Sequence, residues 1–165
     1  MKRLGAPDPD APPSGRLGDW AAKIVSTRPR HLVLCTNERT LLCVVISLAP
    51  HHQLRERFLA AVRHRINQIP APPGLRLAEI GALTEVRWGR ARNRSVLSSM
   101  TQFGHAVTSW LDERPHGDLE VLGLWLCDTP CSPLKTTWPW LEAELLLTGA
   151  VAPGRRPFQS SEHVI

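Results

Sequence analysis

The feature that most restricts how this chain folds is the apolar run TLLCVVISL at residues 40–48, which contains no charged side chain and is rich in β-branched residues. Such a run predicts a β-strand that is covered on both faces. Two segments before it, AAKIVST at 21–27 and HLVLCT at 31–36, are also typical of strands, and the turn segments RPR and NER follow them. Three short strands in succession indicate an antiparallel meander.

Helical periodicity begins after Pro50, a residue that suits the first turn of a helix. Residues 54–69 carry an apolar stripe at helical spacing. The expected basic outer face of this helix consists of Arg57, Arg63 and His64. Arg55 and Arg65 project near the apolar stripe. The favoured interpretation is that their methylene stems cover apolar surface while the guanidinium groups reach water, and the alternative is a buried ion pair or ligand contact.

Further helices are predicted at residues 75–83, 96–114, 118–127 and 136–149. Asp118 is the expected cap of the third of these, although its apolar sequence also suits a strand, and Gly149 is the expected stop of the last. The segment EVRW at 85–88 is a candidate fourth strand. The sequence therefore predicts an α+β fold, with an antiparallel sheet of about three to four strands and helices packed mainly on one face.

A length of 165 residues suits one domain, which we place at residues 18–149. The Pro-rich segment 1–17 and the tail 150–165 are expected to be disordered. No apolar run approaches the ~20 residues that a membrane span needs, and the N-terminus lacks the apolar stretch of a secretory signal. The expected location is the cytoplasm, without membrane association.

The charge of the chain is unevenly distributed. The net charge is +5, but residues 50–100 carry nine cations and three anions (+6), whereas residues 101–149 carry two and seven (−5). This division indicates one basic region rather than a uniformly basic surface. Seventeen of the 20 cations are Arg, a bias that a GC-rich genome also produces.

The four cysteines are expected to be buried, reduced and structural. Cys35 and Cys43 lie in apolar runs, and the spacing of Cys127 and Cys131 matches no common zinc pattern. In a cytoplasmic chain such residues are thiols rather than disulfides. The sequence therefore predicts no metal site and no cofactor.

The stretch EVRWGRARNRSVLSSM at residues 85–100 gathers four arginines immediately before a helix. Either Asn93 or Ser95 suits the N-cap. Cations at the positive end of a helix are unfavourable unless an anion is bound there, so the cluster has two interpretations: a cap with solvated arginines, or an anion-binding site. The candidate anion-binding residues are Arg87, Arg90, Arg92, Asn93, Arg94, Ser95 and Ser98. Acidic side chains of the C-terminal third are an internal alternative to an external anion.

Four segments resemble an uncharacterised bacterial family that is known only as a domain of unknown function. They are LGDW at 17–20, NERTLL at 37–42, NRSVLSSM at 93–100 and TPCSPL at 129–134. The resemblance covers about residues 15–146 and implies a single α+β domain, without implying an activity. The chain departs from the family pattern after Met100, where Thr and Gln replace the usual Asn-Asp.

Transferred residue by residue, the resemblance points to Trp20, Asn37, Thr40, Asn93, Arg94, Ser95, Met100, Thr129 and Pro130. Turn, cap and core roles account for several of them, whereas Arg94 and Ser95 are the hardest to explain by packing.

The sequence is compatible with three functions. The first is a non-enzymatic protein that binds a phosphate-bearing or otherwise anionic partner, nucleic acid above all, through the arginine-rich helix start. The second is a protein-interaction factor, such as an antitoxin, immunity or accessory protein, or one that self-associates through its oppositely charged halves. The third is a small enzyme that acts on a phosphorylated substrate, which the sequence favours least because no base, nucleophile or metal set converges in a motif.

Overall fold

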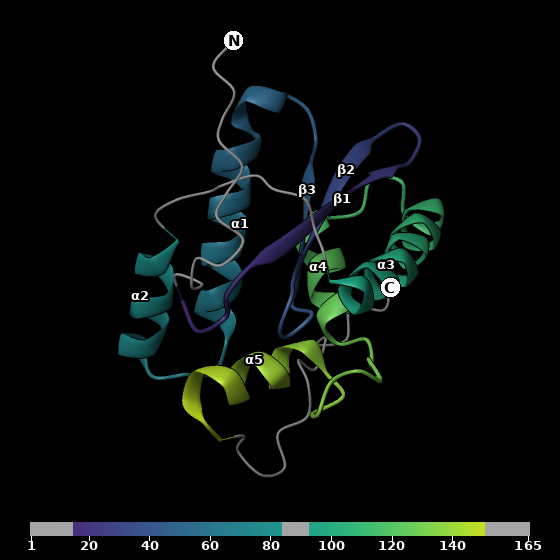
Figure 1. The fold of residues 1–165 in the computed structure, drawn as a ribbon. Helices are drawn as coiled ribbons and strands as arrows, with labels where there is room; N and C mark the ends of the chain where they lie inside the picture. The colour runs from purple at the N-terminus through teal and green to yellow at the C-terminus, as the bar shows by residue number, and fades with distance from the viewer. Residues whose placement is uncertain (1–14, 84–92, 151–165) are drawn as a thin grey trace.

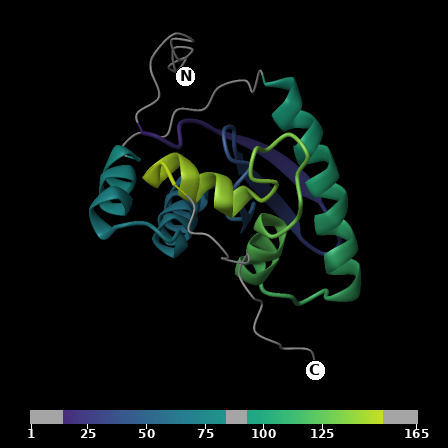
Figure 2. The same cartoon turned by 90° about the horizontal axis from the view of Figure 1, so that it is seen from below.

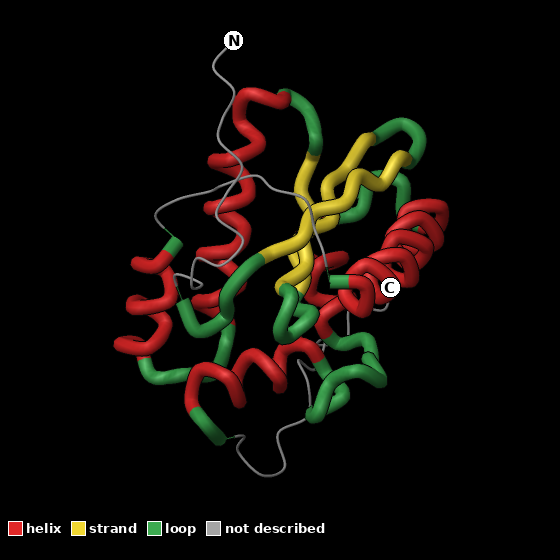
Figure 3. Tube along the Cα trace, viewed as in Figure 1, coloured by secondary structure: helices red, strands yellow, loops and turns green. Residues whose placement is uncertain are grey.

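The computed structural model describes residues 15–83 and 93–150, in which three strands and five α-helices form one α+β domain (Figures 1 and 3). The strands β1 (Trp20–Ser26), β2 (His31–Asn37) and β3 (Cys43–Ser47) pair in that order, and both pairs are antiparallel. The α+β class and the antiparallel meander predicted from the sequence are confirmed. The candidate strand at 85–88 lies outside the described residues.

Strand β3 begins three residues later than the apolar run predicted, because the first part of that run closes the turn after β2. Leu41 adopts a positive φ of 57°. Its amide donates to the Asn37 carbonyl at 3.0 Å, and the Asn37 amide donates to the Leu42 carbonyl at 2.8 Å. A turn of this kind reverses the chain without leaving buried backbone groups unpaired.

Helices cover both faces of the sheet. Alternate residues of a strand point to opposite faces. On one face Trp20 of β1 packs edge-on against Phe58 of α1 (Leu54–Gln68), with ring centroids 6.1 Å apart. On the other face Lys23 of β1 bonds to α3 (Arg94–Glu113), and α4 (Leu119–Cys127) packs on β3. Figures 1 and 2 show α1 and α3 on opposite sides of the strands. The sequence predicted helices mainly on one face of the sheet. In the structure α3 and α4 share one face, and α1 covers the other.

The remaining helices are α2 (Pro73–Ala82) and α5 (Pro139–Thr148), and a short 3-10 turn, His51–Gln53, precedes α1. The helix ends that the sequence predicted at Asp118 and Gly149 are confirmed. Asp118 caps α4 by accepting bonds from the Glu120 and Val121 amides, and Gly149 ends α5 with a φ of 76°. None of the described helices is long and apolar enough to cross a bilayer.

The two N-terminal sequence motifs meet at the buried side chain of Asn37, which is 0% exposed. Its Nδ2 group donates to the carbonyls of Leu17 and Asp19 at 3.0 and 3.2 Å. Its Oδ1 atom accepts from the amides of Arg39 and Thr40 and from the Thr40 hydroxyl, at 3.0–3.1 Å. One amide side chain therefore closes the β2–β3 turn and fixes the entry into β1.

A second polar contact holds the chain just before β1. The buried carboxylate of Glu79 on α2 accepts bonds from the amides of Arg16 and Leu17 at 2.9 and 3.0 Å. Leu17 is part of the core, and the Arg16 guanidinium donates to the Leu147 carbonyl on α5 at 2.7 Å. Arg16 and Leu17, which the predicted domain start at residue 18 left in the disordered segment, are therefore part of the folded domain. The expected disorder of the two ends falls mainly on residues outside the described ranges and stays a prediction.

We expect Asn37→Ala to lower the free energy of unfolding by roughly 2–4 kcal/mol, because it leaves several buried backbone groups without partners. Urea denaturation followed by circular dichroism measures this change. Asn67→Ala, at an exposed position of α1, is the matched control and is expected to change stability by less than about 0.5 kcal/mol. Equal stability of the two variants would contradict the role assigned to Asn37.

Candidate functional site

Asn93 is the N-cap of α3, and Ser95 is not. The Asn93 Oδ1 atom accepts bonds from the amides of Ser95 and Val96 at 3.1 and 3.3 Å, and the Asn93 carbonyl accepts from the Leu97 amide at 3.0 Å. Two of the first-turn amides that an anion would use, those of Ser95 and Val96, are therefore engaged within the protein, and the Leu97 amide makes the first bond of the helix itself. An anion at this end of α3 would be held mainly by side chains.

Of the seven candidate residues, Arg87, Arg90 and Arg92 lie outside the described residues. Asn93 serves as the cap. The other three, Arg94, Ser95 and Ser98, are all exposed on α3.

Arg94 and Ser98 belong to a larger exposed row of polar residues on α3. Thr101 and His105 continue it at positions i+7 and i+11 from Arg94, and all four residues are exposed. Successive residues turn by about 100° in an α-helix, so these four project in nearly the same direction whereas Ser95 does not.

Strand β1 adds a second cation beside this row. The Lys23 amine donates to the Thr101 hydroxyl at 3.1 Å, across 78 positions of sequence. We call Lys23, Arg94, Ser98, Thr101 and His105 the α3 polar stripe. Sequence reasoning missed Lys23 and Thr101, because Lys23 lies in a strand and only tertiary packing brings it to α3. The one signal for Thr101 was its position where the family pattern has Asn.

The internal alternative requires an acidic side chain to neutralise the basic cluster. The candidates in the C-terminal third of the chain are Asp112, Glu113, Asp118 and Asp128. Among residues 15–83 and 93–150, none of them forms an ion pair with Arg94 or Lys23. Glu113 pairs with its neighbour Arg114 at 3.0 Å, and Asp118 caps α4. The two cations of the stripe are therefore not neutralised by the described part of the chain.

Arg65 corrects the favoured interpretation of the α1 arginines. Its side chain is 1% exposed, and the alternative, a buried ion pair, is the one that the structure shows. Nη1 lies 3.2 Å from Oε1 of Glu120 on α4, and Nη2 donates to Oε2 at 3.2 Å. Nε donates to the Cys43 carbonyl of β3 at 3.2 Å. Arg65 therefore joins α1, β3 and α4, whereas Arg55 is exposed.

Close packing around Arg65 explains Gly123 on α4. A Cβ atom at this position would lie 2.7 Å from Arg65 Nη2 and 3.7 Å from the Cys43 carbonyl oxygen. A side chain at 123 would force either the guanidinium group or α4 to shift, and a shift of the guanidinium group would disturb its bonds to Cys43 and Glu120. Glycine at this position therefore leaves room for Arg65 and does not serve a turn.

The expected basic outer face of α1 is only partly present. Arg63 and His64 are exposed. Arg57 is half-buried, and its guanidinium group donates to the carbonyls of Ser47 and Ala49 after β3. The α1 face therefore offers a partner less positive charge than the sequence suggested.

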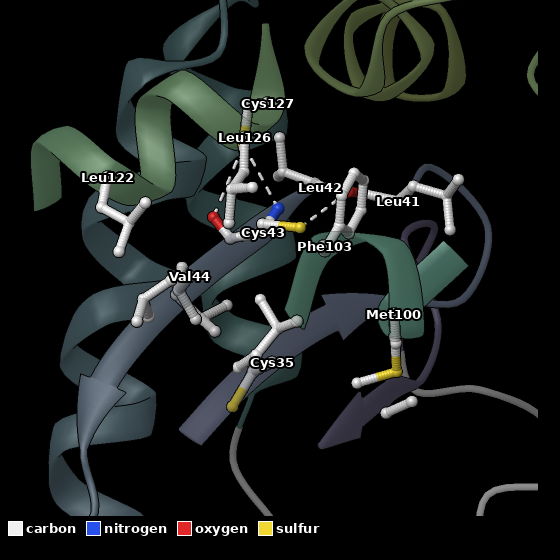
Figure 4. Packing of buried hydrophobic residues seen from close by; sticks show 14 of the residues in the cluster. Cys35, Leu41, Leu42, Cys43, Val44, Met100, Phe103, Leu122, Leu126 and Cys127 are labelled. Atoms are coloured by element: carbon white, nitrogen blue, oxygen red, sulfur yellow. Dashed lines mark hydrogen bonds between the residues drawn. The ribbon is translucent and has the colours of Figure 1, made fainter. Parts of the chain in front are cut away.

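All four cysteines are buried free thiols, as predicted. Figure 4 shows Cys43 and Cys127 side by side, where the Cys43 amide donates to the Cys127 sulfur at 3.2 Å. Burial raises the pKa of both thiols, and it raises the pKa of Cys35 to about 12 and that of Cys131 to about 11. Protonated thiols are poor nucleophiles and poor metal ligands. Within the described ranges, no group of three or more His, Cys, Asp or Glu residues is placed to hold a metal ion.

Asp128 ends α4 in an unusual environment for a carboxylate. Its Oδ1 atom is buried and has no hydrogen-bond partner among the described residues. Burial raises the pKa of this carboxyl from 3.8 to about 6, and the nearby Arg65 guanidinium opposes the rise. Asp128 is therefore partly protonated near pH 6.

Comparison with known proteins identifies a family and nothing more specific. The family described as Domain of unknown function (DUF6933) matches residues 1–142, a range that contains every described strand and the helices α1 to α4. The match confirms the resemblance to an uncharacterised family. No curated protein and no solved structure matches the chain.

We expect Arg65→Ala to lower the free energy of unfolding by about 3 kcal/mol, because it leaves the Cys43 carbonyl and the Glu120 carboxylate without their buried partner. Arg63→Ala is the matched control, since it removes an exposed arginine from the same helix and is expected to cost less than about 0.5 kcal/mol. Urea denaturation of both variants makes the comparison. A similar decrease in the free energy of unfolding of both variants would contradict the stabilising tertiary contacts assigned to Arg65.

Asp128→Asn is expected to change how stability depends on pH. Because the pKa of Asp128 is raised in the folded state, this carboxyl contributes most below its ordinary pKa of 3.8, and the contribution is lost as the pH rises through about 6. Asn resembles the protonated form, so the variant should gain stability over the wild type across that pH range. Urea denaturation at several pH values measures the difference, and parallel profiles of the two proteins would contradict the assignment.

Proposed function

The chain belongs to the family Domain of unknown function (DUF6933), and we propose that it is a non-enzymatic binding protein that takes a phosphate-bearing partner on the α3 polar stripe. The partner class that fits best is nucleic acid, because its phosphates repeat along a line and the stripe is elongated. Phosphate contacts of this kind position a partner without reading its sequence.

The observation that carries the proposal is the contact between Lys23 and Thr101. It brings the amine of β1 to the same surface as the Arg94 guanidinium, with the hydroxyls of Ser98 and Thr101 on the same row. The two cations, with the Ser98 hydroxyl between them, can bind phosphate oxygens by charge-assisted hydrogen bonds, while the Thr101 hydroxyl positions the Lys23 amine. The two cations come from different elements, β1 and α3, and the packing of α3 on β1 brings them to one surface.

Helix electrostatics also favour an anion on this stripe. An exposed cation in the first turn of a helix is unfavourable by about 0.3–1 kcal/mol, because it lies at the positive end of the helix dipole. Arg94 is in this position. A bound phosphate would reverse the sign of the interaction.

The surroundings of the stripe support binding rather than catalysis. Among the described residues, no hydrogen bond joins the Ser98 or Thr101 hydroxyl to a His, a Cys or a carboxylate that would act as a general base. The Thr101 hydroxyl instead donates to the Leu97 carbonyl at 3.0 Å. Neither hydroxyl is therefore activated as a nucleophile in the way that phosphoryl transfer requires.

Fluorescence anisotropy with a labelled oligonucleotide of about 20 nucleotides, single-stranded or duplex, tests the proposal. We expect Lys23→Ala and Arg94→Ala each to weaken binding about fivefold at low salt and to reduce the slope of log K against log salt by about one, because each removes one phosphate contact. Arg63→Ala removes the same charge from α1 and is expected to have little effect.

Three results separate the possible outcomes of this experiment. Absence of binding by the wild type at about 20 mM salt would refute a nucleic-acid partner. Equal weakening by the Arg63 variant would mean that net charge, not the stripe, is responsible. If inorganic pyrophosphate displaced the labelled oligonucleotide as effectively as unlabelled oligonucleotide does, the partner would be a small phosphate compound rather than nucleic acid.

A further inference from the structure

A second exposed surface lies on α4 and has a different chemistry. Val121 and Trp125 are 53% and 45% exposed, and they lie one helical turn apart on the same side of the helix. The other large exposed apolar residues of the described chain are Ile24, Leu77 and Leu97, each on a different element. Exposed tryptophan beside a second apolar side chain is typical of a contact surface between proteins.

The fold prevents α4 from hiding these two side chains. The opposite face of the helix carries Leu122, Leu126 and Cys127, which are fully buried against the sheet, and Figure 4 shows all three pointing toward β3. Gly123 allows the helix to approach Arg65 closely. Rotation of α4 would expose the three core residues, so Val121 and Trp125 remain on the surface.

Carboxylates lie at both ends of the apolar pair. Asp118 precedes Val121 by three residues and is exposed, and Asp128 follows Trp125 by three residues and is half-buried. Asp118 and Asp128 are the N-cap and C-cap residues of α4, so their Cα atoms lie ~15 Å apart along the helix. The cap bonds of Asp118 use its Oδ1 atom, and the Oδ1 atom of Asp128 is buried. We call Asp118, Val121, Trp125 and Asp128 the α4 outer face. The sequence segment 101–149, which includes α4, carries a net charge of −5.

We propose that the α4 outer face docks a basic amphipathic helix of a partner protein. The partner that fits presents two apolar side chains one turn apart against Val121 and Trp125, with a Lys or Arg about one turn beyond each of them. Those cations would meet Asp118 and Asp128, and one of them also reaches the indole face of Trp125. A protein partner fits better than a small molecule, because a single helix face offers no concave pocket.

This surface is separate from the α3 polar stripe in both place and charge. The stripe takes an anionic partner by cations of β1 and α3, whereas the α4 outer face takes a cationic one by its apolar pair and two acids. The two proposals can therefore fail independently of each other.

The test uses the full chain and a designed probe. The probe is a fluorescein-labelled helical peptide of about 18 residues with two Leu one turn apart and Lys one turn beyond each, and its control carries Glu in place of Lys. Fluorescence anisotropy is expected to give at least about tenfold tighter binding of the Lys peptide. Trp125→Ala and Val121→Ala are each expected to weaken binding of the Lys peptide about tenfold. Leu77→Ala removes an apolar side chain of α2 that is more exposed than either of the pair, and it should leave binding within about twofold of the wild type.

Circular dichroism and urea denaturation establish that the variants fold. Val121 is the more exposed of the pair, so its substitution is the less disruptive to folding. The proposal is overturned if the Lys and Glu peptides bind equally, or if both α4 variants bind the Lys peptide as the wild type does. It is also overturned if sedimentation shows a dimer that Trp125→Ala dissociates and the Lys peptide does not, because the occupant is then a second copy of this chain.

Discussion

The constraint on which the rest of this structure depends is the burial of β3 on both faces. Residues 41–46 are all buried, so the chain must supply a helix on each side of the strand. These helices are α1 and α4, and Arg65 joins them by contacting both the Cys43 carbonyl and the Glu120 carboxylate. A charged side chain in this position is costly unless every donor is used, which explains why glycine stands at 123 and why α4 lies so close to the strand.

Most of the residues that stand out in the sequence motifs serve the architecture. Asn37 and Thr40 close the β2–β3 turn and hold the segment that contains Leu17, and Asn93 caps α3. The side-chain atoms that make these bonds are not available to bind a partner. The surfaces that remain combine two motif residues, Arg94 and Ser98, with residues outside the motifs, namely Lys23, Thr101 and His105 of the stripe and the α4 outer face. A search for function among the motif residues alone would therefore find mainly structural positions.

The division of charge along the sequence is partly cancelled by the fold. Arg65 comes from the basic segment and Glu120 from the acidic one, and their pairing removes one charge of each sign from the surface. What remains is a cationic surface on β1 and α3 and an acidic, apolar one on α4. This arrangement suits a protein that contacts two partners of opposite charge, and both contacts are proposals that rest on separate side chains.

The sequence by itself determined most of the local structure: the strand segments from their apolar runs, most helices from their periodicity, and the ends at Asp118 and Gly149 from cap chemistry, all of which depend on residues close together in the chain. At the start of α3 it left Asn93 and Ser95 as alternative caps, and the structure shows Asn93 in that role. It also placed Arg94 and Ser98 at an exposed helix start. Only the tertiary structure decided the environment of Arg65: the sequence favoured a guanidinium group that reaches water, whereas the structure shows it paired with Glu120, 55 positions away. The same holds for Lys23 and Thr101. Pairings over such separations depend on how the layers pack, and no local pattern in the sequence encodes that packing.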